Sequence, residues 1–372
     1  MRRKKVLLEN ENGLSLTGIS HRRFLQLDKD YEQAAAVAEL IYVSDRQPGI
    51  TRMKRGSGFV YQFQHKPVRD KQVLDRIRRL VIPPAWTQVW ICPRENGHIQ
   101  ATGIDQRGRK QYRYHAQWSL LRHETKFHRL YEFGKALPQL RRAIERDLAN
   151  KELTENKVIA TVIALMEHTS IRIGNESYER LYGSHGLTTL RDKHVLVNGN
   201  EVQFSFPGKK GIHHNITLRN KRLARIVQHC RDIPGKELFQ YVDASGNRKP
   251  VDSGMINRYI KEATGMDCSS RDFRTWAGTL NLLRSLCALG GAGNATECKQ
   301  HIVQALDEVS SKLGNSRAVC RKYYVHPKLI ELYEQNTLSQ YVSDMAGQQE
   351  SNEEGLSQEE RLLLNILHFF HN

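Results

Sequence analysis

The chain has 372 residues, of which 39% are hydrophobic and 26% are charged, and this composition supplies a packed core and excludes a wholly disordered protein. Lys and Arg number 57 against 40 Asp and Glu, so the net charge is +17, and we expect a polyanionic partner, either nucleic acid or an anionic membrane surface. The sequence has no apolar run near the roughly 20 residues of a membrane span, and neither a GxxxxGK(S/T) nor an HExxH motif, which argues against a membrane-spanning protein, ATP use and zinc-hydrolase chemistry.

The positive charge is unevenly distributed along the chain. Residues 51–130 hold 17 basic and 5 acidic side chains, whereas residues 331–372 hold 1 basic and 8 acidic side chains. A run of charge is usually a solvated face, but so few acidic residues in the first block favour contact with a polyanion. A basic block followed by a mildly basic body predicts two parts that grip one polyanion.

The first 116 residues are predicted to form a short helical lead-in, residues 1–45, and a small β-rich domain, residues 46–116. Ala, Glu and Leu predominate in the expected helical segment Tyr31–Tyr42. Short strands are expected within residues 48–66, followed by a helix at Val68–Leu80 that Pro83 and Pro84 end. Asn-Gly and Asp-Gln-Arg-Gly turns then separate three predicted strands: Thr87–Cys92, His98–Thr102 and Lys110–Tyr114.

From Trp118 the apolar spacing becomes helical and predicts a larger, mainly α domain over residues 117–340, so the fold class is α+β. A short β interlude has expected strands at Val195–Val197, Val202–Phe206 and Asn215–Leu218, with Pro207–Gly211 as a hairpin tip. The predicted helices are Leu120–Gly134, Leu137–Leu148, Asn156–Met166, Lys221–Cys230, Ser253–Ala263, Phe273–Leu289, Thr296–Leu313 and Arg317–Tyr324.

Residues 341–372 are predicted to form an acidic linker and a C-terminal helix. The segment Gln348–Gly355 is polar and acidic, as linkers commonly are. Ser357 and Glu360 have the spacing of a capping box, which favours the start of a short amphipathic helix.

Two of the segments that could carry chemistry lie in the first half of the chain. In GRKQYRYH (108–115), strand alternation puts Tyr112 and Tyr114 on one face. Aromatic rings among basic groups suit contact with bases and phosphates, although such tyrosines can equally serve packing. In SIRIGNESY (170–178), Arg172 lies among apolar residues and needs an anionic partner, which could also be an internal carboxylate.

Three further segments follow. Lys209, in PGKKG, stands at a hairpin tip, where it could also be an ordinary surface lysine. Arg274, in RDFRTW, lies in the first turns of a helix, whose positive end suits a phosphate, although Arg274 could instead pair with Asp272. The segment LGNSRAVCRKYYVHP (313–327) ends a short helix with two tyrosines, which in general more often pack than react.

In their order along the chain, these segments resemble the type IB DNA topoisomerases, specifically the compact poxvirus-like and bacterial form. The matching runs cover roughly residues 46–335: IPPAW, VWIC, GHIQATG, GRKQYRYH, IRIGNE, FPGKKG, RDFRTWAGT and LGNSRAVCRKYYVHP. The resemblance implies a small β-rich N-terminal domain and a larger helical catalytic domain of the kind shared with tyrosine recombinases, which together close as a C-clamp around duplex DNA.

By motif, the resemblance implies particular residues. Asn315 occupies the place where viral members have histidine and bacterial members commonly have asparagine. Tyr324, nine residues past Asn315 and directly before Val-His-Pro, matches the nucleophile, and the spacing disfavours its neighbour Tyr323. The implied catalytic residues are Arg172, Lys209, Arg274, Asn315 and Tyr324. The implied DNA-contacting residues are Gln111, Tyr112, Tyr114 and Tyr178.

The implied reaction is relaxation of supercoiled DNA by transient cleavage of one strand. A cationic site favours the phenolate of the tyrosine, which is neutral at pH 7 with an ordinary pKa near 10. The two arginines and Asn315 stabilise charge on the phosphate, and Lys209 gives a proton to the departing 5′ oxygen. The 3′-phosphotyrosyl link stores the bond energy, so no ATP, metal or other cofactor is implied.

The implied partner is double-stranded DNA, with no membrane and no obligatory protein partner, and a monomer is expected. The six cysteines are scattered without a CxxC pair, which favours free thiols in a reducing compartment. We therefore expect a cytoplasmic, nucleoid-associated protein.

Three alternatives stand beside this interpretation. A tyrosine recombinase shares the Arg–Lys–Arg–Tyr set, but recombinases usually have a histidine three residues before the second arginine, where this chain has Arg271. A DNA-binding module without activity would use the same residues as ordinary ion pairs. Peripheral membrane binding is disfavoured because the basic block is predicted to form strands rather than an amphipathic basic helix.

Overall fold

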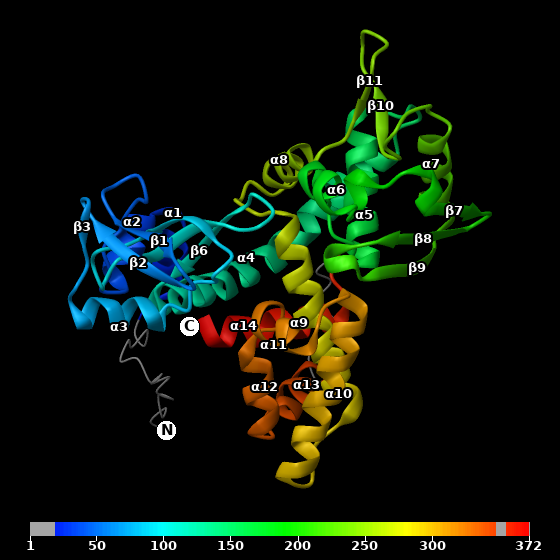
Figure 1. Ribbon diagram of the computed structural model, residues 1–372. Coiled ribbons are helices and arrows are strands. Elements are labelled where there is room, and N and C mark those ends of the chain that lie inside the picture. Colours follow the sequence, from blue (N-terminus) through cyan, green and yellow to red (C-terminus); the bar gives the residue numbers. More distant parts are fainter. Residues whose placement is uncertain (1–18, 347–354, 372) are drawn as a thin grey trace. The chain divides into compact units, whose positions relative to one another are not determined.

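The computed structural model describes residues 19–346 and 355–371 (Figure 1). The chain divides into two compact units: unit 1 extends to Arg129, and unit 2 covers Leu130–Phe370. The long helix α4 (Ala116–Leu148) contributes to both. Residues 1–18, and all of the predicted linker except Gly355, lie outside the described residues.

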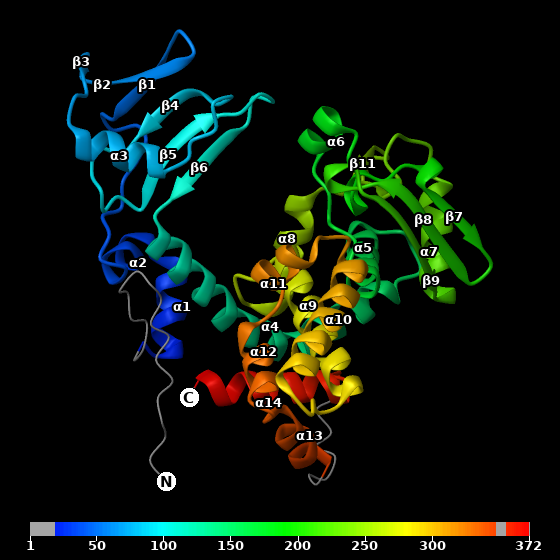
Figure 2. The ribbon, with the colours of Figure 1, turned by 60° about the horizontal axis from the view of Figure 1, so that its bottom comes forward.

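Unit 1 is built around a six-stranded antiparallel sheet in the order β3-β2-β1-β4-β5-β6 (Figure 2). Buried side chains of the strands and Ile77 of helix α3 (Lys71–Arg79) form an apolar core that includes Ile50, Ile91 and Ala101. Asp70 caps the start of helix α3, because its side chain accepts hydrogen bonds from the backbone amides of Gln72 and Val73. The elements are β1 (Ile50–Arg55), β2 (Gly58–Phe63), β3 (Lys66–Pro67), α3 (Lys71–Arg79), β4 (Thr87–Ile91), β5 (Ile99–Ile104) and β6 (Lys110–Tyr114).

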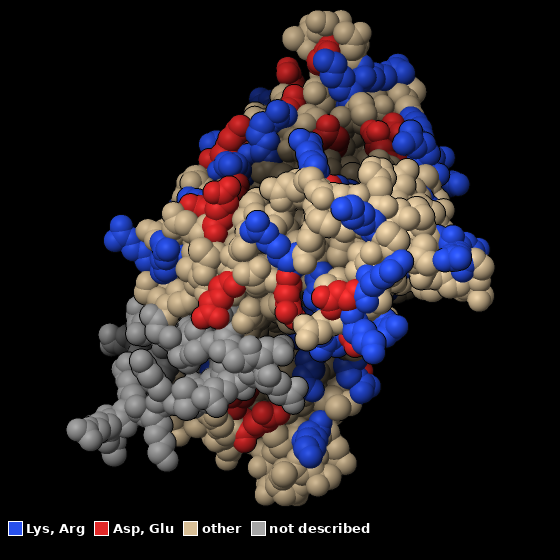
Figure 3. Space-filling model, turned by 60° about the vertical axis from the view of Figure 1, so that its left-hand side comes forward, with Lys and Arg blue, Asp and Glu red and all other residues tan. Residues whose placement is uncertain are grey.

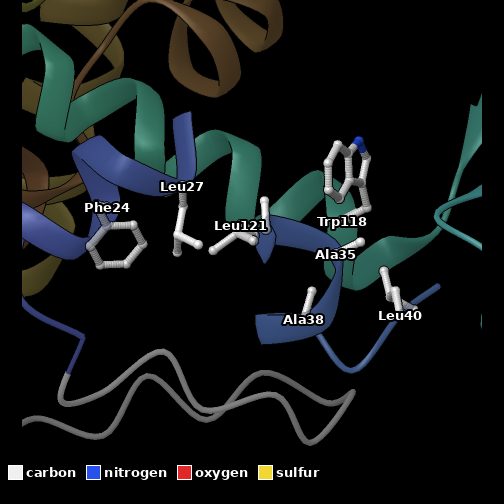
Figure 4. Packing of buried hydrophobic residues seen from close by; sticks show 8 residues of the cluster. Phe24, Leu27, Ala35, Ala38, Leu40, Trp118 and Leu121 are labelled. Carbon is white, nitrogen blue, oxygen red and sulfur yellow. The ribbon is translucent and has the colours of Figure 1, made fainter. Parts of the chain in front are cut away.

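Two short helices precede the sheet and pack on the start of α4. They are α1 (His21–Lys29), capped by Ser20, and α2 (Tyr31–Val37), capped by Asp30. Figure 4 shows Leu27 and Ala35 of these helices grouped with Trp118 and Leu121 of α4 in a second apolar cluster. The expected helix Tyr31–Tyr42 is therefore too long, and α1 was not predicted.

Unit 2 contains the rest of α4 and a mainly helical body with two small sheets. Its further elements are α5 (Glu155–Thr169), α6 (Glu176–Tyr182), η1 (Leu187–Thr189), η2 (Asp192–His194), β7 (Val195–Asn198), β8 (Glu201–Pro207), η3 (Lys209–Gly211), β9 (His213–Arg219), α7 (Lys221–Arg231), β10 (Gln240–Val242), β11 (Arg248–Pro250), α8 (Ser253–Thr264), α9 (Ser270–Leu289), α10 (Ala295–Leu313), α11 (Arg317–Tyr323), α12 (Pro327–Glu334), α13 (Leu338–Ala346) and α14 (Gln358–His371).

Helix α5 is the central element of unit 2. Its run Val158–Met166 is entirely buried, as expected for a helix that is apolar on all sides. Helices α7, α8 and α9 and strand β9 pack around it, and β9 is the edge of the three-stranded sheet β7-β8-β9 (Figure 1). The C-terminal end of α5 thus meets the β8–β9 hairpin and α9, and the candidate site lies at this junction.

The C-terminal helix α14 is anchored on α4 and α9. Four of its apolar side chains, Leu362, Leu363, Ile366 and Leu367, are buried. Its buried Glu360 accepts two hydrogen bonds from Arg141 of α4 at 2.7 and 2.9 Å, and one from Nε1 of Trp276 on α9 at 3.2 Å. Arg141 also binds Glu167 of α5. The capping box expected for this helix is confirmed, since the backbone amide of Ser357 donates to Glu360 and the amide of Glu360 donates back to the Ser357 hydroxyl.

Most predicted strands and helices are confirmed to within a few residues, but one prediction is wrong in kind. The expected helices Leu120–Gly134 and Leu137–Leu148 are the single helix α4, which continues through Pro138. Leu137 and Leu140 on either side of this proline are buried, so packing holds the helix together where Pro138 removes a hydrogen bond. Besides α1, three helices (α6, α12 and α13) and the short hairpin β10–β11 were not predicted.

Candidate functional site

Arg172 lies just after α5, in an extended segment held by backbone contacts. Ser170 ends α5 in a left-handed conformation (φ 55°), and the Arg172 carbonyl accepts from the backbone amide of Leu187 at 2.9 Å. A Cβ atom on Gly186 would lie 2.5 Å from the Arg172 carbonyl oxygen, so this close approach requires glycine. The guanidinium donates to Oδ1 of Asn315 at 2.6 Å. Its partner is thus an amide, and the internal carboxylate considered from the sequence is not what it binds.

Arg274 is buried in the second turn of α9 and binds the ends of two other helices. Its Nη1 donates to the carbonyl of Ser170, at the end of α5, and its Nη2 donates to the carbonyl of Leu313, the last residue of α10, at 2.7 Å. The negative ends of two helix dipoles therefore stabilise the guanidinium without a carboxylate. Burial and the neighbouring Arg172 lower the pKa of Arg274 to about 10, which keeps it charged at neutral pH.

Asp272 does not pair with Arg274, which was the alternative expected from the sequence. The Asp272 carboxylate instead accepts from the backbone amide and the hydroxyl of Ser269 at the start of α9. Within the described part of the chain, Nε of Arg274 is buried without a hydrogen-bond partner. A buried donor of this kind can bind a ligand oxygen at low cost.

Tyr324 follows α11 and lies beneath Arg274. The Arg274 guanidinium is 5.2 Å from the centre of the Tyr324 ring. Burial of the Tyr324 phenol favours its neutral form, but the charges of Arg274 and Arg172, a hydrogen bond with Arg274 and the charge of Lys209 outweigh burial and lower its pKa below 10.0. A Cβ atom on Gly278 of α9 would lie 2.4 Å from the Tyr324 carbonyl oxygen, so α9 fixes the backbone of this residue. The neighbouring Tyr323 is 47% exposed, with Lys322 over its ring.

Asn315 follows α10 in a turn that Gly314 makes possible. Gly314 is left-handed (φ 57°), and the Asn315 backbone amide donates to the Ser310 carbonyl at 3.1 Å. The Asn315 side chain binds Arg172 through its oxygen, while its Nδ2 is buried and has no partner among the described residues. The site therefore contains a second unused donor, Nδ2 of Asn315, beside Nε of Arg274.

Lys209 stands at the tip of the β8–β9 hairpin, as the sequence predicted. Gly208 and Ile212 close the tip with a 2.7 Å backbone hydrogen bond, and the Lys209 side chain is exposed. Loss of hydration, and then the positive charge of Arg172, lower the pKa of Lys209 below 10.5, and the phenol of Tyr324 opposes this. A lysine whose pKa is lowered gives up its proton more readily.

His214 is a site residue that the sequence analysis missed. Its ring packs on Phe206 and against two glycines, since a Cβ atom on Gly208 would lie 2.4 Å from its Cδ2 and one on Gly314 would lie 2.5 Å from its Cε1. These glycines precede Lys209 and Asn315, so the imidazole joins the two segments. Burial, Arg172 and Arg274 lower the pKa of His214, which is therefore neutral at pH 7. Strand alternation puts His214 on the half-buried face of β9, and that was the one signal that could have found it.

The predicted DNA-contacting residues belong to other elements than those that form this cluster. Tyr112 and Tyr114 lie on β6 of unit 1 with stacked rings 5.7 Å apart, and Gln111 donates to Asp105 at 3.0 Å. Tyr178 lies on α6 of unit 2, 42% exposed and packed beside Tyr182.

The face shown in Figure 3 carries charges of both signs. On the face shown in Figure 3, Lys and Arg side chains are interspersed with Asp and Glu, so the excess positive charge forms no continuous patch there.

No group of three or more His, Cys, Asp or Glu residues that could hold a metal ion occurs within residues 19–346 and 355–371. None of the helices in these two ranges is both long and apolar enough to span a membrane.

Comparison with known proteins agrees with this geometry. The family model for the catalytic core of eukaryotic DNA topoisomerase I matches residues 115–351, and the model for the N-terminal domain of bacterial DNA topoisomerase IB matches residues 58–105. DNA topoisomerase 1B of Acanthamoeba polyphaga mimivirus is 35% identical over 297 residues, which are 77% of this chain and 88% of that protein. DNA topoisomerase I of monkeypox virus is 20% identical over 246 residues, 65% of this chain and 74% of that protein. The chain therefore belongs to the type IB DNA topoisomerase family, in its poxvirus-like and bacterial form, and is an isomerase that acts on DNA.

Proposed function

We propose that this enzyme relaxes supercoiled DNA by cleaving one strand through a 3′-phosphotyrosyl intermediate on Tyr324 and then resealing it. The observation that carries the proposal is the position of the Tyr324 phenol under a buried arginine that has no carboxylate partner. In the reaction, the phenolate oxygen forms a bond to phosphorus as the bond to the 5′ oxygen breaks. The free 5′ hydroxyl reverses the step after the DNA has rotated.

The phosphate would be held by the donors that the structure leaves unused. Nε of Arg274 and Nδ2 of Asn315 are buried without partners among the described residues, and Arg172 binds Asn315. Such preorganised donors stabilise the charge that develops on the two nonbridging oxygens in the transition state. We assign this role to Arg172, Arg274 and Asn315.

Lys209 is proposed as the general acid for the departing 5′ oxygen. It is exposed at a hairpin tip, where it can reach DNA, and its lowered pKa suits proton transfer. The same amine takes the proton back when the 5′ hydroxyl attacks in the resealing step.

The proposal also states how the enzyme binds DNA, whether it needs a protein partner, and whether the reaction needs ATP or a metal. Gln111, Tyr112, Tyr114 and Tyr178 contact the duplex, and the two units close around it as a C-clamp. We propose that the enzyme acts as a monomer without an obligatory protein partner. Because the phosphotyrosyl bond conserves energy, neither ATP nor a metal is needed, and a DNA substrate implies association with the nucleoid.

The test is plasmid relaxation in EDTA without ATP, with Tyr324→Phe and Tyr323→Phe compared. Tyr323→Phe should relax DNA at the wild-type rate, whereas Tyr324→Phe should bind DNA but form no adduct that detergent traps. A 5′-labelled cleaved strand should become attached to protein, and the other fragment should carry a free 5′ hydroxyl. Activity retained by Tyr324→Phe and lost by Tyr323→Phe would refute the assignment of the nucleophile.

A further inference from the structure

Unit 1 carries a row of exposed tyrosines that is longer than the two predicted on β6. Tyr112 and Tyr114 of β6 are 42% and 46% exposed, and Tyr31 and Tyr42 are 47% and 43% exposed. Tyr31 begins α2, and Tyr42 lies in the connection to β1. Both residues precede the part of the chain that matches the bacterial N-terminal domain, residues 58–105.

The segment around Tyr42 is fixed to the edge of the sheet. The backbone amide of Ile41 donates to the Asn96 carbonyl, and the amide of His98 donates to the Ile41 carbonyl, both at 2.9 Å. The Val43 amide then donates to Nδ1 of His98 at 3.0 Å, and the Tyr42 ring stacks on the same imidazole at 4.2 Å. Tyr42 is therefore held in place from both its backbone and its ring.

The same segment continues along the face of β6. The Asp45 carboxylate accepts from the Thr102 hydroxyl at 2.9 Å and pairs with Lys110 at 2.5 Å. Thr102 is the cross-strand partner of Tyr112, and Lys110 lies 5.6 Å from the centre of the Tyr112 ring. Burial raises the pKa of Tyr114 most, and the neighbouring phenols of Tyr112 and Tyr42 raise it further. Tyr42 therefore lies close to Tyr114. Arg46 is exposed and close enough to Lys110 for its charge to act on that amine, so residues 42–46 lie beside the two tyrosines of β6.

Tyr31 completes the row. Its ring lies 6.5 Å from that of Tyr42 and meets the Trp118 ring edge-on at 6.3 Å. The Arg122 guanidinium lies 5.0 Å from the centre of the Tyr31 ring. No hydrogen bond of the Tyr31, Tyr42, Tyr112 or Tyr114 hydroxyl occurs within the described residues, and all four side chains are exposed, so their phenols are available as donors to a ligand.

We propose that Tyr31 and Tyr42 extend the duplex-binding surface of β6, and that the four tyrosines and Arg46 contact the sugar–phosphate backbone of double-stranded DNA. The inference rests on the proposed function for the identity of the polymer. Its support is the continuity of the row and the positive charge beside it, since Lys110 lies over the Tyr112 ring and Arg122 lies over the Tyr31 ring. Fixed phenol donors suit phosphate oxygens, and tyrosine is among the side chains that make such contacts.

The experiment measures equilibrium binding of a linear duplex in the Tyr324→Phe background, where no covalent step can contribute. The variant Tyr31→Phe/Tyr42→Phe keeps both rings and removes both hydroxyls. Two lost hydrogen bonds should weaken binding about 10-fold. The matched control is Tyr61→Phe, because the Tyr61 ring packs against the core of the same sheet and should leave affinity unchanged.

Salt dependence separates neutral contacts from charged ones. Arg46→Gln should make the slope of log affinity against log salt shallower by about one, since one fewer counterion is released. The double tyrosine variant should lower affinity without changing that slope. With Tyr324 restored, its cleavage rate at saturating DNA should equal the wild-type rate, which a general disturbance of unit 1 would not allow.

Wild-type affinity of Tyr31→Phe/Tyr42→Phe for the duplex would overturn the proposal, as would a loss of affinity confined to single-stranded DNA. The proposed function fails by a separate result, namely an adduct that persists without Tyr324.

Discussion

The buried amide nitrogen of Asn315 gives the sharpest test of how the phosphate is held. Its Nδ2 has no partner among the described residues, while Oδ1 binds Arg172 at 2.6 Å. Asn315→Ala removes one preorganised donor, and losing one such donor typically costs about 10²–10³ in rate. Because the guanidinium of Arg172 also loses its anchor, we expect the upper half of this range, about 10³.

The assay is single-turnover formation of the covalent adduct on a duplex, together with the resealing rate. A donor that acts only in the transition state serves both directions, so cleavage and resealing should slow by the same factor, and the adduct fraction at equilibrium should stay unchanged. Asn315→Asp should be slower still, because it places a negative charge where the phosphate charge develops. The matched control is Asn247→Ala, an exposed asparagine of the β10–β11 turn, which should be as active as the wild type.

Two results would refute this reasoning. Asn315→Ala within about fivefold of the wild-type rate would mean that Nδ2 does not donate to the phosphate, given the typical cost of a lost donor. A loss of DNA affinity with an unchanged rate at saturation would mean that the amide serves binding of the ground state.

Three further predictions follow from the electrostatics and packing of unit 2. The pKa values of Lys209 and Tyr324 are both lowered. The cleavage rate should therefore rise with pH as Tyr324 ionises and fall at higher pH as Lys209 loses its proton. In the Lys209→Ala variant, the fall of the rate at alkaline pH should be absent. His214→Ala should slow adduct formation about 100-fold, because it releases the segments that carry Lys209 and Asn315. His214→Phe should recover most of that loss, because its ring refills the space. Equal rates for the two variants would contradict a positioning role. Glu360→Gln should destabilise unit 2 by about 3 kcal/mol in calorimetry, against under about 1 kcal/mol for the exposed Glu359→Gln. Since the pKa of Glu360 is lowered from 4.5, this stabilisation is present above pH 4.5 and should be lost as pH falls through the lowered value; a pH-independent difference between Glu360→Gln and the wild type would contradict it.

The sequence predicted elements with strong local signals and failed where tertiary contacts decide. Lys110–Tyr114 is a strand with the expected bounds because alternation and the preceding turn agree. The two predicted helices around Pro138 are one, since burial of Leu137 and Leu140 outweighs the local preference to stop. Short-range patterns contain no information about such packing.

For the candidate site too, local motifs predicted the residues, whereas the tertiary contacts between them could not be predicted. Motif order predicted that Arg172, Arg274 and Asn315 belong together, and the structure places them in contact or close by. Their partners could not be predicted, because Asn315 lies 143 residues after Arg172, and Arg274 binds the ends of two separate helices. His214 was missed because its importance comes from two glycines in different segments.

The anchoring of α14 has a consequence for the order in which the enzyme becomes active as it is synthesised. Glu360 follows Arg141 by 219 residues, and it binds Trp276, two residues beyond Arg274. Contacts between residues so distant in sequence form late, since a long loop must close first. A nascent chain can therefore present every proposed catalytic side chain, Tyr324 included, before α14 has packed on α9. We expect such a chain to hold Arg274 loosely and to cleave DNA poorly until α14 has left the ribosome, which would delay strand breakage until the fold that reseals the strand is complete.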